Sequence, residues 1–129
     1  MRDMVGFFGI TADVLEEEPL PLERLLQAIR RTHLSLYITF SEFCPMLPLE
    51  SMSVGVPCLV GPTSHLFEDD AWLFERLVVP FPDRADVIAD YVGRALRERS
   101  EIMPAYCRYI VGYNERARRS VEEFLADGA

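Results

Sequence analysis

The stretch from Leu34 to Val60 constrains the fold most strongly, because its pattern fits a strand, a helix and a second strand. Residues 34–39 form a β-prone apolar run, and Cys58–Val60 forms a shorter one. Between them, Pro48 suits the first turn of a helix, where its missing N–H group costs nothing. Gly55 suits the left-handed position just past a helix end. The stretch therefore predicts a β-α-β unit with parallel strands.

The loop of this unit, residues 40–47, is expected at the carboxyl end of the first strand, where open α/β sheets bind their ligands. Glu42 lies just past that strand, and Glu50, after seven intervening residues, is expected in the first helical turn. Carboxylates accept hydrogen bonds from hydroxyl groups, while free N–H groups at a helix N-terminus bind phosphate. The alternatives are that Glu50 only favours the helix dipole and that Glu42 is an exposed loop acid.

These acids stand in a longer pattern, which runs from Ser41-Glu42 through Glu50-Ser51-Met52 to Gly55-Val56-Pro57 and a hydrophobic strand. The pattern resembles the donor-site signature of retaining glycosyltransferases with the GT-B fold, with Ser51 in place of the usual alanine. The resemblance implies retaining transfer of a sugar from a nucleotide-diphosphate sugar to a hydroxyl acceptor. It also implies that Glu42 contacts the donor sugar as the catalytic residue and that Glu50 binds the ribose hydroxyls. No metal or other cofactor is implied.

The sugar pocket departs from the family pattern. The family often has glycines directly after the first glutamate, but this chain has Phe43, Cys44 and Pro45, and proline has no N–H group to donate. The variant resembles a subgroup of the same family. By this resemblance, main-chain groups around residues 43–47 are expected near the diphosphate. The donor-binding candidates are Glu50, Phe43, Cys44, Met46, Leu47, Thr63 and Ser64.

Two of these candidates, Thr63 and Ser64, belong to the loop that leaves the second strand of the unit. This loop is expected to border the same crevice, and His65 follows them in it. An alternative is that these polar side chains only cap the next helix, since polar residues are common in such loops.

The remaining periodicity predicts a single α/β domain over residues 1–129, with a parallel sheet of about four strands flanked by helices. The resemblance implies that this domain is an incomplete nucleotide-sugar-binding domain, a partial Rossmann-like sheet that forms the C-terminal half-domain of a GT-B fold. The four strands are expected at residues 4–8, 34–39, 57–60 and 77–79. Helices are expected at 21–31, after the acids 68–70, at 83–99 with Asp83 as N-cap, and at 100–125. The last segment reads as one long helix or two, with Gly112 and Asn114 marking a break.

Composition narrows the function classes. The formal net charge is −8 and all thirteen basic residues are arginines. We therefore expect no nucleic-acid partner, and no Schiff-base or P-loop lysine. Three widely spaced cysteines favour a reduced cytoplasmic setting. No apolar run approaches the ~20 residues of a transmembrane helix.

The resemblance covers only a minority of a whole enzyme. In the family, the nucleotide-binding domain begins with two further β-α units that carry an arginine and a lysine for the diphosphate. We therefore expect the isolated chain to be inactive and to need its missing N-terminal half, a partner subunit or self-association. The alternative function is a non-catalytic module that binds nucleotide sugars or another protein. A receiver or flavodoxin-like domain fits less well, because a receiver needs a late lysine.

Overall fold

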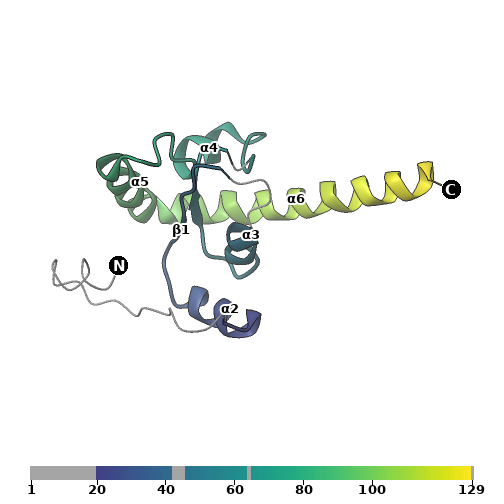
Figure 1. The fold of residues 1–129 in the computed structure, drawn as a ribbon, viewed down its shortest axis with the longest axis horizontal. Helices are drawn as coiled ribbons and strands as arrows, with labels where there is room; N and C mark the ends of the chain where they lie inside the picture. The colour runs from purple at the N-terminus through teal and green to yellow at the C-terminus, as the bar shows by residue number, and fades with distance from the viewer. Residues whose placement is uncertain (1–19, 42–45, 64, 129) are drawn as a thin grey trace.

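A computed structural model describes residues 20–41, 46–63 and 65–128 (Figure 1). This part of the chain is α/β and mostly helical, with one small parallel sheet. Its elements in order are α2 (Leu22–Arg30), β1 (Ser35–Tyr37), α3 (Met46–Ser53), β2 (Cys58–Val60), α4 (Ala71–Leu77), α5 (Ala85–Arg97) and α6 (Arg99–Asp127).

The predicted β-α-β unit is present. Strands β1 and β2 pair in parallel, with Ser35 opposite Cys58 and Tyr37 opposite Val60, and α3 connects them. Gly55 has a φ of 75° just past the end of α3, the backbone conformation that its glycine predicts. The helix begins at Met46, two residues before the expected start. Pro48 therefore lies within the first turn, but Glu50 is in the second turn rather than in the first.

The expected four-stranded sheet is not confirmed, because the described residues contain only β1 and β2 as strands. The strand predicted at 77–79 is wrong. Leu77 is the last residue of α4, and Val78 forms only an isolated parallel bridge with Val60. Val79 donates its N–H to the Val60 carbonyl (2.8 Å), after which Pro80 has no N–H to extend the ladder. The strand predicted at 4–8 lies outside the described residues.

Helix α6 is continuous over 29 residues, so the break expected at Gly112 and Asn114 is wrong. A glycine inside a helix costs only about 1 kcal/mol relative to alanine, which flanking contacts can offset. Here Tyr109 and Tyr113, one turn apart, both pack against the core cluster of buried side chains. Figure 1 shows α6 crossing the body of the molecule and projecting from it at its C-terminal end.

The starts of α4 and α5 differ in how well the sequence predicts them. The acids before α4 favour a helix start, and Asp70 caps this helix by accepting a hydrogen bond from the Leu73 N–H (3.0 Å). The cap predicted at Asp83 is wrong, because α5 begins at Ala85 and its N-cap residue is Arg84. Arg84 instead forms an ion pair with Asp86 (2.5 Å).

The core is built around β2, whose three residues are completely buried. Helices α3 and α4 both contact this strand, and α6 contacts α3, α4 and α5. Ile102 and Tyr106 of α6 are also completely buried. The strand that leads to the predicted site is therefore held in a well-packed core. In the part of the chain that the structure describes, no helix is both long and apolar enough to cross a membrane.

Candidate functional site

The loops that leave β1 and β2 lie against each other at the carboxyl edge of the sheet. Gly61 approaches Thr39 so closely that a Cβ atom at position 61 would lie 2.1 Å from the Thr39 carbonyl oxygen. The Thr63 hydroxyl donates a hydrogen bond to the Phe40 carbonyl oxygen (3.4 Å). Thr63, a predicted donor-binding residue, thus joins the two loops to each other.

The start of α3 carries the other described donor-binding candidates. Met46 is exposed, whereas Leu47 and Glu50 are half-buried. No described residue forms a hydrogen bond or an ion pair with the Glu50 carboxylate, although the Ser53 hydroxyl donates to the Glu50 main-chain carbonyl (2.7 Å). A half-buried carboxylate that the described residues leave without a partner is suited to a ligand.

The predicted catalytic residue Glu42 and the donor-binding candidates Phe43, Cys44 and Ser64 lie outside the described residues. Of the predicted site, the structure therefore describes Met46, Leu47 and Glu50, all on α3, together with Thr63 on the neighbouring loop.

Folding contacts account for the second half of the sequence pattern. Ser51 is completely buried, and its hydroxyl donates to the Val56 carbonyl oxygen (2.7 Å) and shares a hydrogen bond with the Ser35 hydroxyl (2.9 Å). Gly55 ends α3 with its positive φ, and Pro57 is completely buried before β2. The contacts of these residues stabilise the turn between α3 and β2. By contrast, the Glu50 carboxylate forms no hydrogen bond or ion pair with the described residues.

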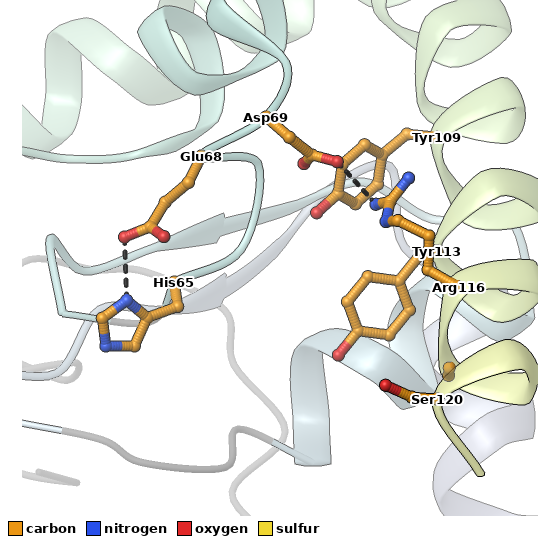
Figure 2. Close-up of a pocket in the computed structure, with 8 residues that line it drawn as sticks. His65, Glu68, Asp69, Tyr109, Tyr113, Arg116 and Ser120 are labelled. Atoms are coloured by element: carbon orange, nitrogen blue, oxygen red, sulfur yellow. Dashed lines mark hydrogen bonds and ion pairs between the residues drawn. The ribbon is translucent and has the colours of Figure 1, made fainter. Parts of the chain in front are cut away.

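A second feature near this edge is a hollow of about 360 Å³ between the loop after β2 and α6 (Figure 2). It is lined by residues of two distant segments: His65, Glu68 and Asp69 from the loop, and Tyr109, Tyr113, Arg116, Ala117 and Ser120 from α6. Two pairs, each of a carboxylate with a nitrogen-containing side chain, line its rim. The His65 Nδ1 atom lies 2.8 Å from a Glu68 carboxylate oxygen, and the Arg116 guanidinium lies 2.7 Å from an Asp69 carboxylate oxygen.

The loop side of this hollow has an unusual backbone. His65 and Phe67 have φ values of 54° and 68°, a region that residues other than glycine seldom adopt. The Phe67 side chain is completely buried, and its ring lies 4.9 Å from the Tyr109 ring between centroids. The Phe67 N–H donates to the Tyr109 hydroxyl (2.9 Å), and burial raises the pKa of that phenol. These contacts hold the strained loop in one position against α6.

The sequence predicts only part of this hollow. His65 is a polar residue after the second strand, whereas the acids Glu68 and Asp69 favour only a helix start. The spacing of Tyr109, Tyr113 and Arg116 places all three on one helix face, a signal that could have pointed to a shared surface. Only the tertiary fold brings that face to the loop, because 39 residues separate Asp69 from Tyr109 in the sequence.

No protein-family model, curated protein or solved structure matches this chain. Within residues 20–41, 46–63 and 65–128, no group of three or more His, Cys, Asp or Glu side chains is arranged to hold a metal ion.

Proposed function

We propose that this chain is the donor-binding part of a retaining sugar-nucleotide glycosyltransferase. The observation that carries the proposal is the Glu50 carboxylate, which is half-buried on α3, has no partner among the described residues and stands at the family spacing from Glu42. Ribose hydroxyls would supply the hydrogen bonds that this carboxylate lacks. The parallel β-α-β unit supports the proposal, because it is the context in which the family carries the motif.

The proposed reaction transfers a sugar from a nucleotide-diphosphate sugar to a hydroxyl group. The bond between the anomeric carbon and the diphosphate oxygen breaks, and a bond from that carbon to the acceptor oxygen forms on the same face. The proton of the acceptor hydroxyl passes to the departing nucleoside diphosphate. Glu42 holds the donor sugar and Glu50 the ribose. The N–H groups of Met46 and Leu47, in the first turn of α3, are suited to the diphosphate. On this proposal the chain contributes positioning and electrostatic stabilisation.

A second candidate is a non-catalytic module that binds nucleotide sugars or docks to another protein. The observation that favours it is the lack of any lysine in the chain, together with a net charge of −8. The family uses a lysine and an arginine to neutralise the diphosphate, so a chain without the lysine would bind the donor weakly by itself. The same Glu50 contact to ribose serves either function.

Calorimetric titration with UDP, GDP and ADP tests the shared part of both proposals. We expect one nucleotide to bind with saturation and the binding to weaken in Glu50→Ala by roughly 10- to 100-fold, the usual effect of losing hydrogen bonds to a charged group. Glu115→Ala, which removes an exposed carboxylate from α6, is the matched control and should bind like the wild type. Equal binding by all three proteins would refute the role of Glu50.

Transfer activity separates the two candidates. In an assembly that shows transfer activity, Glu42→Ala should reduce turnover and leave nucleotide affinity close to that of the wild type. Unchanged turnover in this variant would contradict the catalytic assignment of Glu42. Nucleotide binding without transfer activity in any assembly of this chain would favour the binding module.

A further inference from the structure

We propose that the hollow between residues 65–69 and α6 binds a neutral, polyhydroxylated ligand such as a saccharide. The inference goes beyond the proposed donor site, because neither Glu50 nor Thr63 lines this hollow. Its basis is the set of hydrogen-bonding groups that face one space from two sides (Figure 2).

The α6 side of the hollow offers hydroxyl groups that the fold does not use. No described residue forms a hydrogen bond with the hydroxyl of Tyr113 or of Ser120, whereas the Tyr109 hydroxyl already accepts from the Phe67 N–H. Figure 2 shows these three oxygens pointing from α6 toward the side that carries His65. The two free hydroxyls can each donate and accept, which suits ligand hydroxyls.

The loop side offers charged groups that are already paired. The Glu68 carboxylate is 2.8 Å from His65, and the Asp69 carboxylate is 2.7 Å from Arg116. A carboxylate has about four acceptor positions and a guanidinium has five donors, so a ligand hydroxyl can bind either group without breaking its pair. A charged ligand would have to compete with the protein partner instead.

The charges of the rim disfavour other ligand classes. Two carboxylates against one guanidinium repel a phosphate when His65 is neutral. A bound metal ion would need a third ligand, and the described residues contain no such group. A zwitterion would need its carboxylate on Arg116 in place of Asp69. A neutral ligand is not repelled by the carboxylates, needs no third metal ligand and does not compete with Asp69 for Arg116.

The shape of the hollow also suits a sugar. Its volume of about 360 Å³ lies in the range of small-molecule sites, which runs from about 300 to 1,000 Å³. The half-buried ring of Tyr113, whose centroid lies 6.0 Å from that of the buried Tyr109 ring, adds apolar surface for the C–H face of a sugar ring. Because the His65–Phe67 backbone is held by buried contacts, the rim does not have to be ordered when the ligand binds.

The test is an NMR titration of the whole chain with tyrosine rings labelled with carbon-13. The probes are methyl glucoside, methyl mannoside, methyl galactoside and N-acetylglucosamine, with inorganic phosphate and glycine as charged comparisons. We expect at least one saccharide to shift the Tyr109 and Tyr113 signals with saturation, while phosphate and glycine do not. Shifts by phosphate or glycine alone, or by none of the probes, would overturn the proposal.

Two variants locate the binding. Tyr113→Phe and Ser120→Ala each remove one free hydroxyl without touching the core, so each should weaken saccharide binding roughly three- to ten-fold. The matched controls are Tyr91→Phe on α5 and Ser100→Ala at the start of α6, which should leave the affinity unchanged. Equal affinity in all four variants would place the saccharide elsewhere and refute the site. Nucleotide titration of the same variants tests the donor site separately, because neither Tyr113 nor Ser120 belongs to it and their substitution should leave nucleotide affinity unchanged.

Discussion

The phenol of Tyr106 on α6 donates a hydrogen bond to the carbonyl oxygen of Val56 at 3.0 Å, fifty residues earlier in the chain. The same carbonyl accepts a hydrogen bond from the Ser51 hydroxyl at 2.7 Å. All three groups are buried, so one main-chain oxygen joins α3, the start of β2 and the long C-terminal helix. This contact sets the position of the Gly-x-Pro turn, and through it the end of the helix that carries Glu50.

Because the Ser51 and Tyr106 hydroxyls donate to the same carbonyl oxygen, we expect either donor to compensate in part for loss of the other. Ser51→Ala and Tyr106→Phe should each cost about 1 kcal/mol of unfolding free energy, because the Val56 carbonyl keeps one partner. The double variant leaves that carbonyl unsatisfied and should cost roughly 1–2 kcal/mol more than the sum of the two. Urea unfolding of all four proteins gives this coupling. Additive costs would show that the carbonyl does not depend on these two donors.

Opposite effects are expected from two glycine substitutions. Gly61→Ala should destabilise the fold by about 1–3 kcal/mol, since its Cβ would lie 2.1 Å from the Thr39 main-chain oxygen. Gly93→Ala, in the interior of α5, should stabilise it by about 0.5–1 kcal/mol through helix propensity. The new Cβ at position 93 meets only the end of the Arg97 side chain, at 3.1 Å, which can move. Thermal unfolding of both variants provides the measurement. A stable Gly61→Ala protein would show that the two loops at the sheet edge are not in close contact.

Alkaline pH is predicted to weaken the fold through Cys58. Burial raises the pKa of its thiol from 9.0 to about 12. The unfolded chain therefore loses this proton first, so the contribution of Cys58 is complete below pH 9 and falls as the pH rises toward 12. The slope for one group approaches about 1.4 kcal/mol per pH unit.

The matched variant is Cys58→Ala, which removes the titrating thiol. Unfolding free energies measured at pH 8, 9 and 10 should fall less steeply in this variant than in the wild type. Tyr106 adds a further decrease above its ordinary pKa near 10, because burial raises the pKa of this phenol as well. Identical slopes in both proteins between pH 9 and 10 would contradict the assignment to Cys58.

Local signals in the sequence predict the β-α-β unit well. Pro48 lies in the first turn of the helix and Gly55 follows its end, and both adjoining strands form where the apolar runs predict them. The strand at 77–79 fails because periodicity cannot distinguish a helix end from a short buried strand when both are apolar. Leu77 is buried as part of α4 rather than as part of the sheet.

The two parts of the candidate site also differ in whether local sequence signals predict them. The sequence places Glu50 on the helix after the first strand to within one turn, because helix boundaries are local features. The hollow at His65 is not, because Tyr113 and Ser120 reach it only through the packing of α6 against the body of the molecule. The positive φ values of His65 and Phe67 have no glycine to signal them, and the buried contacts of Phe67 with Tyr109 form only in the folded chain.

The most direct test of the donor-site proposal is a thermodynamic cycle between the Glu50 carboxylate and the ribose hydroxyls. Calorimetry would measure the wild type and Glu50→Ala, each with the nucleoside diphosphate that binds and with its 2′,3′-dideoxy analogue. We predict that Glu50→Ala weakens the ribonucleotide roughly 10- to 100-fold and barely affects the dideoxy analogue, because only the ribose hydroxyls donate to this carboxylate. An equal loss for both ligands, or no loss for either, would contradict the account.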